Sequence, residues 1–383
     1  HHSCEVNGRK VKSGDFLTLD AGSEGRLYLG QGKTANLSFR EGVIQEVSKL
    51  ISRVLQAEHV PLEVRVNVNN AKDAEVGLQF GADGVGLCRT ENMFMEPEAI
   101  REIRNIVFTN DAKATPDSFK KLEERQFEDF RKIFEVMNGR VVNIRLMDLP
   151  LHDLVPQTDA DFNELATQLK HIPRDQLQTR ALGLKEHNPM LGLRACRFGL
   201  ITPEVYEMQI RAITRAAYAV KANRQPVDPG IMFPLVFTDA ELSMLRNKVN
   251  EIEEQVRSDL KVAHSDKIHF RVGSMIELPA AALNTDQLAR VGEFFAFGTN
   301  DLTQTTLGMS RDDSNHYLPQ YLEMKILTAD PFKVLSDPVR ELVETAVRRG
   351  RRVRLDASFG ICGEQGGDPA SLRFCLERGL NYV

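Results

Sequence analysis

The stretch FFAFGTNDL, residues 294–302, runs from four apolar residues through a glycine into three polar residues. Residues 268–278 and 358–364 have a similar form, because each changes from mainly apolar to acidic or small residues. Short apolar runs that break into turn residues are typical of buried parallel strands. In a (β/α)8 barrel the carboxyl ends of the strands carry the active site, so we expect the groups there to meet. These groups are Glu277, Asp301 and Cys362.

Strand-like and helix-like segments alternate along most of the chain, which predicts an α/β fold and specifically a (β/α)8 TIM barrel. Long insertions after the second and third strands, residues 93–139 and 149–188, are expected to lie over the barrel mouth and to shield it from water. The remaining strands are predicted at residues 64–68, 84–90, 141–147 and 230–233, with an eighth near residues 191–196.

Two helices carry clear terminal signals. Thr238 and Glu241 form a capping box in front of an apolar stripe at helical spacing. Asp337 and Pro338 predict the start of another helix, and Gly350 predicts its end. Near the N-terminus, two short β-like runs around residues 22–23 predict the closing hairpin of a small β-containing domain.

The composition excludes several classes of protein. The 383 residues are 42% hydrophobic and 27% charged, and the formal net charge of −5 argues against nucleic acid as a partner. No apolar run is long enough to span a membrane, and no signal-peptide pattern opens the chain. Five scattered cysteines are no disulfide framework, so we expect a cytoplasmic location.

Glu277 and Asp301 are the first candidate site residues. They lie 24 residues apart, about one βα unit, so they are expected on neighbouring strand ends. A carboxylate pair of this kind is typical of a Mg²⁺ site. The alternative is two unrelated acids that cap helices or form ion pairs. The preceding residues 298–300, Gly-Thr-Asn, favour the site because a glycine lets backbone N–H groups approach an anionic ligand.

Arginines and a thiol complete the set. Arg89 and Arg145 each lie near the end of an apolar strand, where a guanidinium can bind carboxylate or phosphate in a bidentate manner. The alternative is a structural ion pair with Glu91 or Asp148, and Arg194 and Arg197 are weaker candidates. Cys362 lies among glycines that leave room for a ligand, and a thiol can exchange protons near neutral pH. Cys88 and Cys196 compete for that role.

Five blocks of sequence together closely resemble the phosphoenolpyruvate/pyruvate-binding domain of the phosphoenolpyruvate-utilising enzymes, above all of the pyruvate, phosphate dikinases. They span about residues 67–383, and the GTNDLTQ and GICGE segments are highly specific. The blocks are GADGVGLCRTENMF from Gly81, NIRLMDLPLHDLVP from Asn143, NPMLGLRACRFGL from Asn188, FFAFGTNDLTQTTLGMSRDD from Phe294, and GICGEQGGDPASLRFCLERGLNYV from Gly360.

The resemblance implies a phosphotransferase that interconverts pyruvate and phosphoenolpyruvate on a TIM barrel. It implies residues 1–42 as the remnant of a swivelling phosphohistidine domain, residues 43–60 as a linker helix and residues 61–383 as the barrel. Phosphohistidine and ATP-binding domains of a parent protein would be partners, and a homodimer is expected. The implied roles are phosphoryl binding by Arg89 and Arg145, Mg²⁺ binding by Glu277 and Asp301, substrate contact by Gly298, Thr299 and Asn300, and proton exchange by Cys362.

The chain departs from the family pattern in three respects. The histidine block and the ATP-binding domain are absent from it, and it stops at Val383, before the terminal segment that such domains usually have. We therefore expect a fragment or a trimmed relative. Three positions where relatives often carry histidine are Asn92, Leu193 and Gln365 here, which puts local proton transfer in doubt.

Two other functions are compatible with the same residues. A Mg²⁺-dependent lyase or aldolase that acts through a pyruvate enolate would share the carboxylate pair but would not need two phosphoryl-binding arginines. A non-catalytic module would bind phosphoenolpyruvate without exchanging any proton. Comparing the affinities for phosphoenolpyruvate and pyruvate separates the first alternative, and methyl-proton exchange separates the second.

Overall fold

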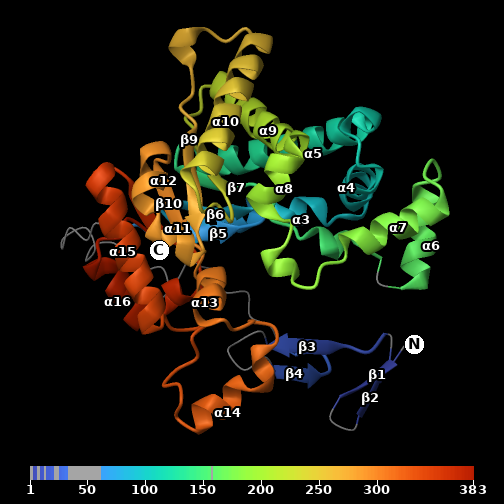
Figure 1. Ribbon diagram of the computed structural model, residues 1–383, viewed down its shortest axis with the longest axis vertical. Coiled ribbons are helices and arrows are strands. Elements are labelled where there is room, and N and C mark those ends of the chain that lie inside the picture. Colours follow the sequence, from blue (N-terminus) through green and yellow to red (C-terminus); the bar gives the residue numbers. More distant parts are fainter. Residues whose placement is uncertain (1–2, 7–8, 13, 21–25, 33–61, 157) are drawn as a thin grey trace. The chain divides into compact units, whose positions relative to one another are not determined.

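The computed structural model describes residues 3–6, 9–12, 14–20, 26–32, 62–156 and 158–383 (Figure 1). The chain divides into two units, residues 1–54 and 55–383. The first unit contains the predicted hairpin as an antiparallel pair of strands, and a second antiparallel pair that was not predicted. The predicted linker helix lies outside the described residues. The strands of this unit are β1 (Ser3–Val6), β2 (Arg9–Lys12), β3 (Leu17–Asp20) and β4 (Arg26–Leu29).

The second unit is built on a curled parallel sheet, which confirms the α/β class. Within the described residues the sheet has seven strands in the order β11-β10-β9-β8-β7-β6-β5, so each strand pairs with its neighbours in sequence. All seven lie where apolar runs predicted them. The strands are β5 (Arg65–Val68), β6 (Gly84–Arg89), β7 (Val141–Arg145), β8 (Asp228–Phe233), β9 (Arg271–Ile276), β10 (Phe294–Phe297) and β11 (Ser358–Ile361).

The last three residues join the two edges of this sheet. Tyr382 forms parallel bridges to Glu63, just before β5, and to Gly360 on β11. The Glu63 N–H donates to the Asn381 carbonyl at 2.9 Å, and the Ile361 N–H donates to the Tyr382 carbonyl at 3.2 Å. This short segment therefore takes the place of the eighth strand, and the barrel prediction is confirmed.

The predicted position of the eighth strand was wrong. Residues Pro189–Leu191 form the 3-10 turn η3, and Ala195–Ile201 form the helix α8. Pro189 lacks the N–H that a strand ladder needs, and Ala195 has a φ of 55°, which is incompatible with extended backbone. The helix instead packs against α9 (Pro203–Ala222) and buries Ala195, Cys196 and Phe198.

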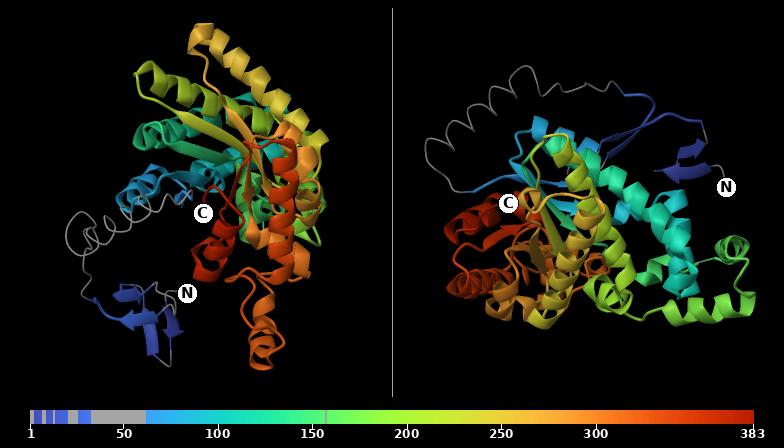
Figure 2. Two further views of the ribbon diagram at one scale, coloured as in Figure 1. Left: turned by 90° about the vertical axis from the view of Figure 1, so that its left-hand side faces the viewer. Right: turned by 90° about the horizontal axis from the view of Figure 1, so that it is seen from above.

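Helices follow the strands and cover the outside of the curled sheet, as the two views in Figure 2 show. The remaining helices outside the two insertions are α2 (Ala71–Gln79), α10 (Asp239–Asp259), α11 (Pro279–Leu283), α12 (Thr285–Val291), α13 (Thr299–Leu307), α14 (Leu318–Glu323), α15 (Asp337–Val353) and α16 (Pro369–Glu377). The helix α5 (Pro116–Met137), which lies in the first insertion, packs most extensively on α9, and α12 packs on α15.

The helix-terminal predictions had different outcomes. The capping box is present, because the Thr238 side chain accepts from the Glu241 N–H and the Glu241 carboxylate accepts from the Thr238 N–H. The predicted end of α15 at Gly350 was wrong, since the helix continues to Val353. Gly350 is buried inside it, and a Cβ there would lie about 2.4 Å from the ring of Phe359. The glycine permits close packing of helix on strand instead of ending the helix.

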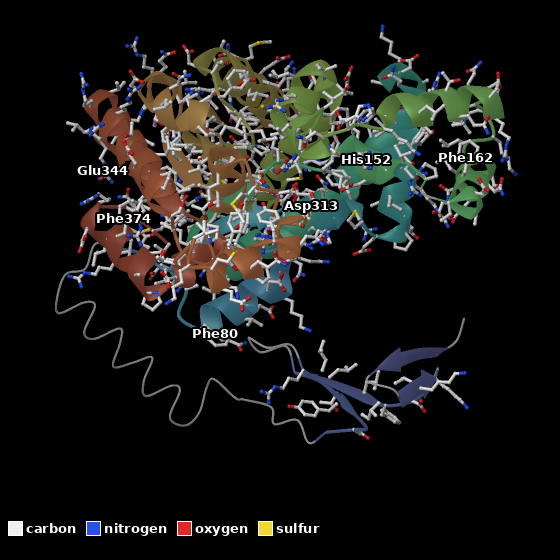
Figure 3. All side chains as sticks on the ribbon, turned by 60° about the horizontal axis from the view of Figure 1, so that its bottom comes forward. Phe80, His152, Phe162, Asp313, Glu344 and Phe374 are labelled. Atoms are coloured by element: carbon white, nitrogen blue, oxygen red, sulfur yellow. The ribbon has the colours of Figure 1, made fainter. Side chains whose placement is uncertain are left out.

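The two insertions do not shield the mouth in the predicted way. The first contributes α3 (Glu91–Phe94), α4 (Pro97–Thr109) and α5, and the second contributes α6 (Asp159–Gln168) and α7 (Arg174–Leu184). Helices α6 and α7 bury a cluster of their own against Phe108 of α4. In Figure 3, Phe162 of α6 lies well away from Asp313, which follows α13.

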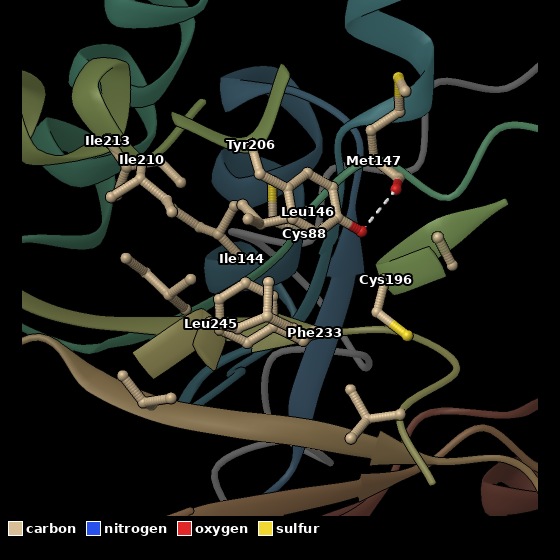
Figure 4. Packing of buried hydrophobic residues seen from close by; sticks show 14 of the residues in the cluster. Cys88, Ile144, Leu146, Met147, Cys196, Tyr206, Ile210, Ile213, Phe233 and Leu245 are labelled. Carbon is tan, nitrogen blue, oxygen red and sulfur yellow. Dashed lines mark hydrogen bonds between the residues drawn. The ribbon is translucent and has the colours of Figure 1, made fainter. Parts of the chain in front are cut away.

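The main core lies between the sheet and its helices. Figure 4 shows Tyr206 of α9 packed among side chains from β7 and β8, with its O–H donating to the Met147 carbonyl at 3.0 Å. Cys88 and Cys196 are fully buried in this core, where desolvation raises the pKa of both thiols well above the ordinary value. They are small core residues. Among the described residues, no helix has the length and apolarity needed to cross a membrane.

Candidate functional site

A cavity of about 360 Å³ lies where the carboxyl ends of the strands meet. Its walls bring together every residue that the sequence predicted for the site, although these residues are spread over more than 270 positions of the chain. None of residues 93–139 or 149–188 lines it. The predicted residues that line the cavity are Arg89, Arg145, Glu277, Gly298, Thr299, Asn300, Asp301 and Cys362.

Three carboxylates form the acidic wall of the cavity. Glu277 follows β9 directly, Asp301 lies in the first turn of α13, and Asp148 follows β7. One oxygen from each lies within 4.8 Å of the others. The sequence predicted Glu277 and Asp301 as a pair but treated Asp148 only as a partner for an arginine. Its position three residues beyond a strand end was the one available signal.

The acidic wall is buried and carries like charges at close range. Glu277 is 1% exposed, and its Oε1 accepts from the Leu235 N–H at 2.6 Å. Burial raises the pKa of Glu277, and the charges of Asp301 and Asp148 raise it further. Burial also raises the pKa of Asp301, although the Arg194 guanidinium opposes that shift. Neighbouring carboxylates that hinder each other's ionisation are stabilised by a cation between them.

The residues present suit a divalent cation. The guanidiniums of Arg145 and Arg194 form ion pairs with Asp148, Asp301 and Glu91, whereas Glu277 has no ion pair with a described residue. Hard oxygen ligands with room for substrate oxygens and water match the preference of Mg²⁺.

Arg194 holds Asp148 in place. Its Nε and Nη2 donate to Oδ1 and Oδ2 of Asp148 at 2.7 and 2.6 Å, and its Nη2 lies 3.5 Å from Asp301 Oδ2. Burial alone would lower the pKa of Arg194, but the adjacent Asp148 carboxylate raises it, so the guanidinium stays charged. Arg197 donates to the carbonyls of Leu191 and Gly192 and does not line the cavity.

The two arginines expected to bind phosphoryl groups differ in their surroundings. Arg145 makes ion pairs with Glu91 at 3.2 Å and with Asp148 at 3.4 Å, so the structural pairing weighed from the sequence is present. Burial would lower its pKa, but these carboxylates raise it. Arg89 pairs with β7 through its backbone at the end of β6, but its side chain has no hydrogen bond or ion pair to any described residue. Its guanidinium is thus available to an anionic ligand.

The start of α13 forms another wall. A Cβ on Gly298 would lie 2.5 Å from Glu277 Oε2, so only glycine leaves that carboxylate undisturbed. The Thr299 O–H donates to Gln365 Oε1 at 2.6 Å. The Oδ1 of Asn300 is buried and has no hydrogen-bond partner among the described residues. An unsatisfied acceptor on a cavity wall indicates a missing donor.

Cys362 lies beside this wall, one residue past β11, which pairs with β10. Its Sγ–H donates to the Phe297 carbonyl at 3.5 Å, and it is 6% exposed. Burial raises the pKa of this thiol from 9.0 to about 12, although nearby Arg145 acts in the other direction. At neutral pH the group is therefore a neutral thiol that carries a proton to give.

The three residues at positions where relatives often have histidine differ in their location and contacts. Gln365 is fully buried and links Thr299 to the Pro331 carbonyl, to which its Nε2 donates at 3.2 Å. Asn92 is exposed, and Leu193 faces a different cavity beside α8. Neither lines the site.

A segment that the sequence did not predict for the site closes one side of it. We call residues 308–313, between α13 and η5 (Ser314–His316), the mouth loop. Arg311 and Asp312 of this loop line the cavity. Arg311 Nη2 donates to Glu364 Oε1 at 2.6 Å, which joins the mouth loop to the segment after Cys362.

Known proteins have similar sequences over this whole region. The family described as PEP-utilising enzyme, PEP-binding domain matches residues 45–383. A pyruvate, phosphate dikinase of Treponema pallidum is 40% identical over 99% of this chain and 43% of its own length. Those of Giardia intestinalis and Clostridium symbiosum are 39% and 38% identical over 99% of the chain.

The chain spans about two fifths of the length of these relatives, 41% to 43%. The match extends across the described barrel and includes every residue that lines the cavity. The chain therefore belongs to the family of PEP-utilising enzymes, in the part that is their PEP-binding domain.

Proposed function

We propose that this chain carries out the phosphoenolpyruvate/pyruvate half-reaction of a phosphotransferase of the pyruvate, phosphate dikinase type. The observation that supports this most is the composition of one cavity. An acidic wall, an arginine side chain that has no partner among the described residues and a neutral thiol all face a space of about 360 Å³. That volume is within the range of small-ligand sites.

Arg89 and Arg145 would bind the phosphoryl group. A transferring phosphoryl group spreads negative charge over its oxygens, and fixed cations stabilise that charge. Arg89 supplies an uncommitted guanidinium, while the carboxylates around Arg145 hold its side chain in one position. Thr299 and the unsatisfied Asn300 carbonyl would contact the substrate at the start of α13, next to Gly298.

Glu277 and Asp301 would hold Mg²⁺, with Asp148 as a third carboxylate within reach. When bound there, Mg²⁺ supplies Lewis-acid stabilisation of negative charge on the oxygens of the three-carbon substrate. The Arg194 guanidinium fixes the orientation of Asp148, and the Leu235 N–H fixes that of Glu277. Preorganised groups of this kind need little rearrangement during reaction.

Cys362 would exchange the proton at the methyl carbon. When the phosphoryl group leaves phosphoenolpyruvate for the phosphohistidine domain, the pyruvate enolate remains. The Sγ–H bond then breaks, its proton forms a C–H bond at the terminal carbon, and the thiolate remains. In the other direction the thiolate removes a methyl proton. The raised pKa keeps the thiol in its donor form at neutral pH.

Exchange of pyruvate methyl protons with solvent deuterium tests this half-reaction without the other domains. We expect Mg²⁺-dependent exchange by the wild-type chain and its loss in Cys362→Ala. Cys375→Ala is the matched control, because Cys375 is also a buried free thiol but does not line the cavity. Full exchange in Cys362→Ala would exclude the proposed proton role.

The remaining partners belong to the parent protein. We propose that residues 1–42 complete a phosphohistidine domain, that residues 43–60 link it to the barrel, and that an ATP-binding domain charges the histidine. The β3–β4 hairpin supports this, because a two-stranded hairpin needs further packing for stability. Its large apolar side chains are 39% to 68% exposed, namely Phe16, Leu17, Leu19, Leu27, Tyr28 and Leu29.

We therefore expect that the chain alone does not catalyse the full dikinase reaction. Adding the separate phosphohistidine and ATP-binding domains is expected to restore that activity. We also propose a homodimer and a cytoplasmic location, which suits the four free cysteines that are buried within the described part of the chain. Sedimentation velocity tests the dimer. A single monomeric species at all accessible concentrations would contradict it.

A further inference from the structure

Gln304 lies three residues after Asp301 on α13, so the two side chains share one helix face. Its Nε2 donates to Asp301 Oδ1 at 3.0 Å. An ionised carboxylate only accepts hydrogen bonds, so this contact fixes which end of the amide points to Asp301. The other carboxylate oxygen, Oδ2, faces Arg194.

The same residue anchors the mouth loop. Gln304 Oε1 accepts from the Arg311 N–H at 2.8 Å. Its backbone carbonyl accepts from the N–H groups of Gly308 and Met309. Gly308 ends the helix with a φ of 61°, which favours glycine. Gln304 therefore accepts hydrogen bonds from three backbone N–H groups of residues 308–311.

The mouth loop in turn connects two walls of the cavity. Arg311 extends from it to Glu364, two residues after Cys362. A continuous set of hydrogen bonds thus runs from Asp301 through Gln304 and the mouth loop to the segment that follows the thiol. An amide can serve this path because it offers one donor and one acceptor at the same time, which neither a carboxylate nor an alkyl group does.

We propose that Gln304 is a positioning residue that orients the Asp301 carboxylate toward the cation and couples cation binding to closure of the mouth loop. The inference rests on the proposed Mg²⁺ site. A bound cation fixes Asp301, Asp301 fixes the Gln304 amide, and the amide holds the Arg311 N–H. Partners that orient a metal ligand in this way change metal affinity by about 10- to 100-fold when removed.

Calorimetric titration with Mg²⁺ tests whether Gln304 orients Asp301 toward the cation. Oxalate is present in the titration as a planar mimic of the enolate. Gln304→Leu keeps the size of the side chain and removes both hydrogen bonds. We expect its Mg²⁺ dissociation constant to rise about 10-fold or more. The matched control is Thr306→Ala on the same helix, because the Thr306 hydroxyl has no partner among the described residues. It is expected to bind as the wild type does.

Hydrogen exchange of the backbone amides in residues 308–314 measures the coupling between cation binding and closure of the mouth loop. Because linkage is reciprocal, cation binding is expected to slow this exchange in the wild type by about the same 10-fold factor. In Gln304→Leu exchange is expected to be fast with or without Mg²⁺. Gln304→Glu keeps the acceptor for the Arg311 N–H, so its loop is expected to stay protected but not to respond to Mg²⁺.

The outcomes separate this inference from the proposed function. A wild-type chain that binds no Mg²⁺ with oxalate overturns the metal role on which both rest. Wild-type Mg²⁺ affinity in a folded Gln304→Leu overturns the inference alone. If that variant does not fold, loop exchange in Gln304→Glu that still responds to Mg²⁺ overturns it as well.

Discussion

Arg194 holds Asp148 by two hydrogen bonds of 2.7 and 2.6 Å, from residues 46 positions apart in the chain. The two side chains are only 6% and 1% exposed. Desolvating both charges is costly, and the pair offsets that cost only while both partners are present. The pair also orients a carboxylate at the cavity wall, so stability and the metal site depend on the same contact.

Removing one partner should therefore destabilise the fold strongly. Arg194→Ala removes both close hydrogen bonds to the buried Asp148 carboxylate and leaves it only the 3.4 Å ion pair with Arg145, so we expect a loss of about 3 kcal/mol in the free energy of unfolding. Arg373→Ala is the control, because Arg373 pairs with Glu377 while its side chain is 83% exposed, and such pairs contribute about 1 kcal/mol at most. Urea unfolding of both variants measures the difference. Equal losses would contradict the assigned role of the buried pair.

Gly298→Ala tests how tightly α13 packs on the acidic wall. The new Cβ would lie 2.5 Å from Glu277 Oε2 and 2.7 Å from the Met275 methyl, so Glu277 must move. We expect Mg²⁺-dependent proton exchange to fall by at least about 10-fold, as for other losses of ligand orientation. Gly367→Ala is the control, since no atom lies within 4 Å of its added Cβ. Unchanged exchange in Gly298→Ala would show that Glu277 need not hold its position.

Arg89→Ala separates a phosphoryl-binding site from a lyase that ignores phosphate. A charged hydrogen bond contributes about 1.5–3 kcal/mol, so phosphoenolpyruvate affinity should fall by roughly 10-fold or more. Pyruvate affinity should change much less, because pyruvate lacks the phosphoryl group. Arg290→Ala, an exposed arginine away from the cavity, serves as the control. Equal effects on both ligands, measured by calorimetry, would favour the lyase.

The raised pKa of Cys362 predicts a dependence of stability on pH. In the unfolded chain the thiol ionises near 9.0, but in the folded protein it stays protonated up to about 12. The unfolded state therefore binds fewer protons between these values, and stability falls as pH rises through this window, by at most about 1.4 kcal/mol per pH unit. Below pH 9 the contribution is constant.

Comparing the wild type with Cys362→Ala isolates this contribution, because three other buried thiols have raised pKa values in both proteins. We expect the free energy of unfolding to decline less steeply above pH 9 in the variant. Parallel declines in the two proteins would mean that Cys362 ionises as readily in the folded state as in the unfolded state.

Much of this architecture could be predicted from local sequence. The runs that became β9, β10 and β11 are apolar and end in turn residues, so position and burial follow from pattern alone. The closing segment, residues 381–383, could not be found in this way. It has three residues, and its role depends on two barrel edges that are far apart in sequence.

The residues of the site also divide into those that local sequence predicts and those that depend on distant contacts. Glu277, Asp301 and Cys362 were predictable because each follows a recognisable strand. Asp148 was missed as a third carboxylate, since its place on the wall depends on an arginine 46 residues away. Gln304 and the mouth loop were missed as well. Their importance comes from hydrogen bonds that join one helix to a loop and not from any residue type that signals chemistry.

A crystal structure of the chain with Mn²⁺ and phosphoenolpyruvate tests the central claim most directly. The account predicts anomalous density for the cation between the carboxylates of Glu277 and Asp301, the phosphoryl group at Arg89, and the methylene carbon facing the sulfur of Cys362. A cation bound elsewhere, or a substrate whose methylene carbon points away from that sulfur, would contradict it.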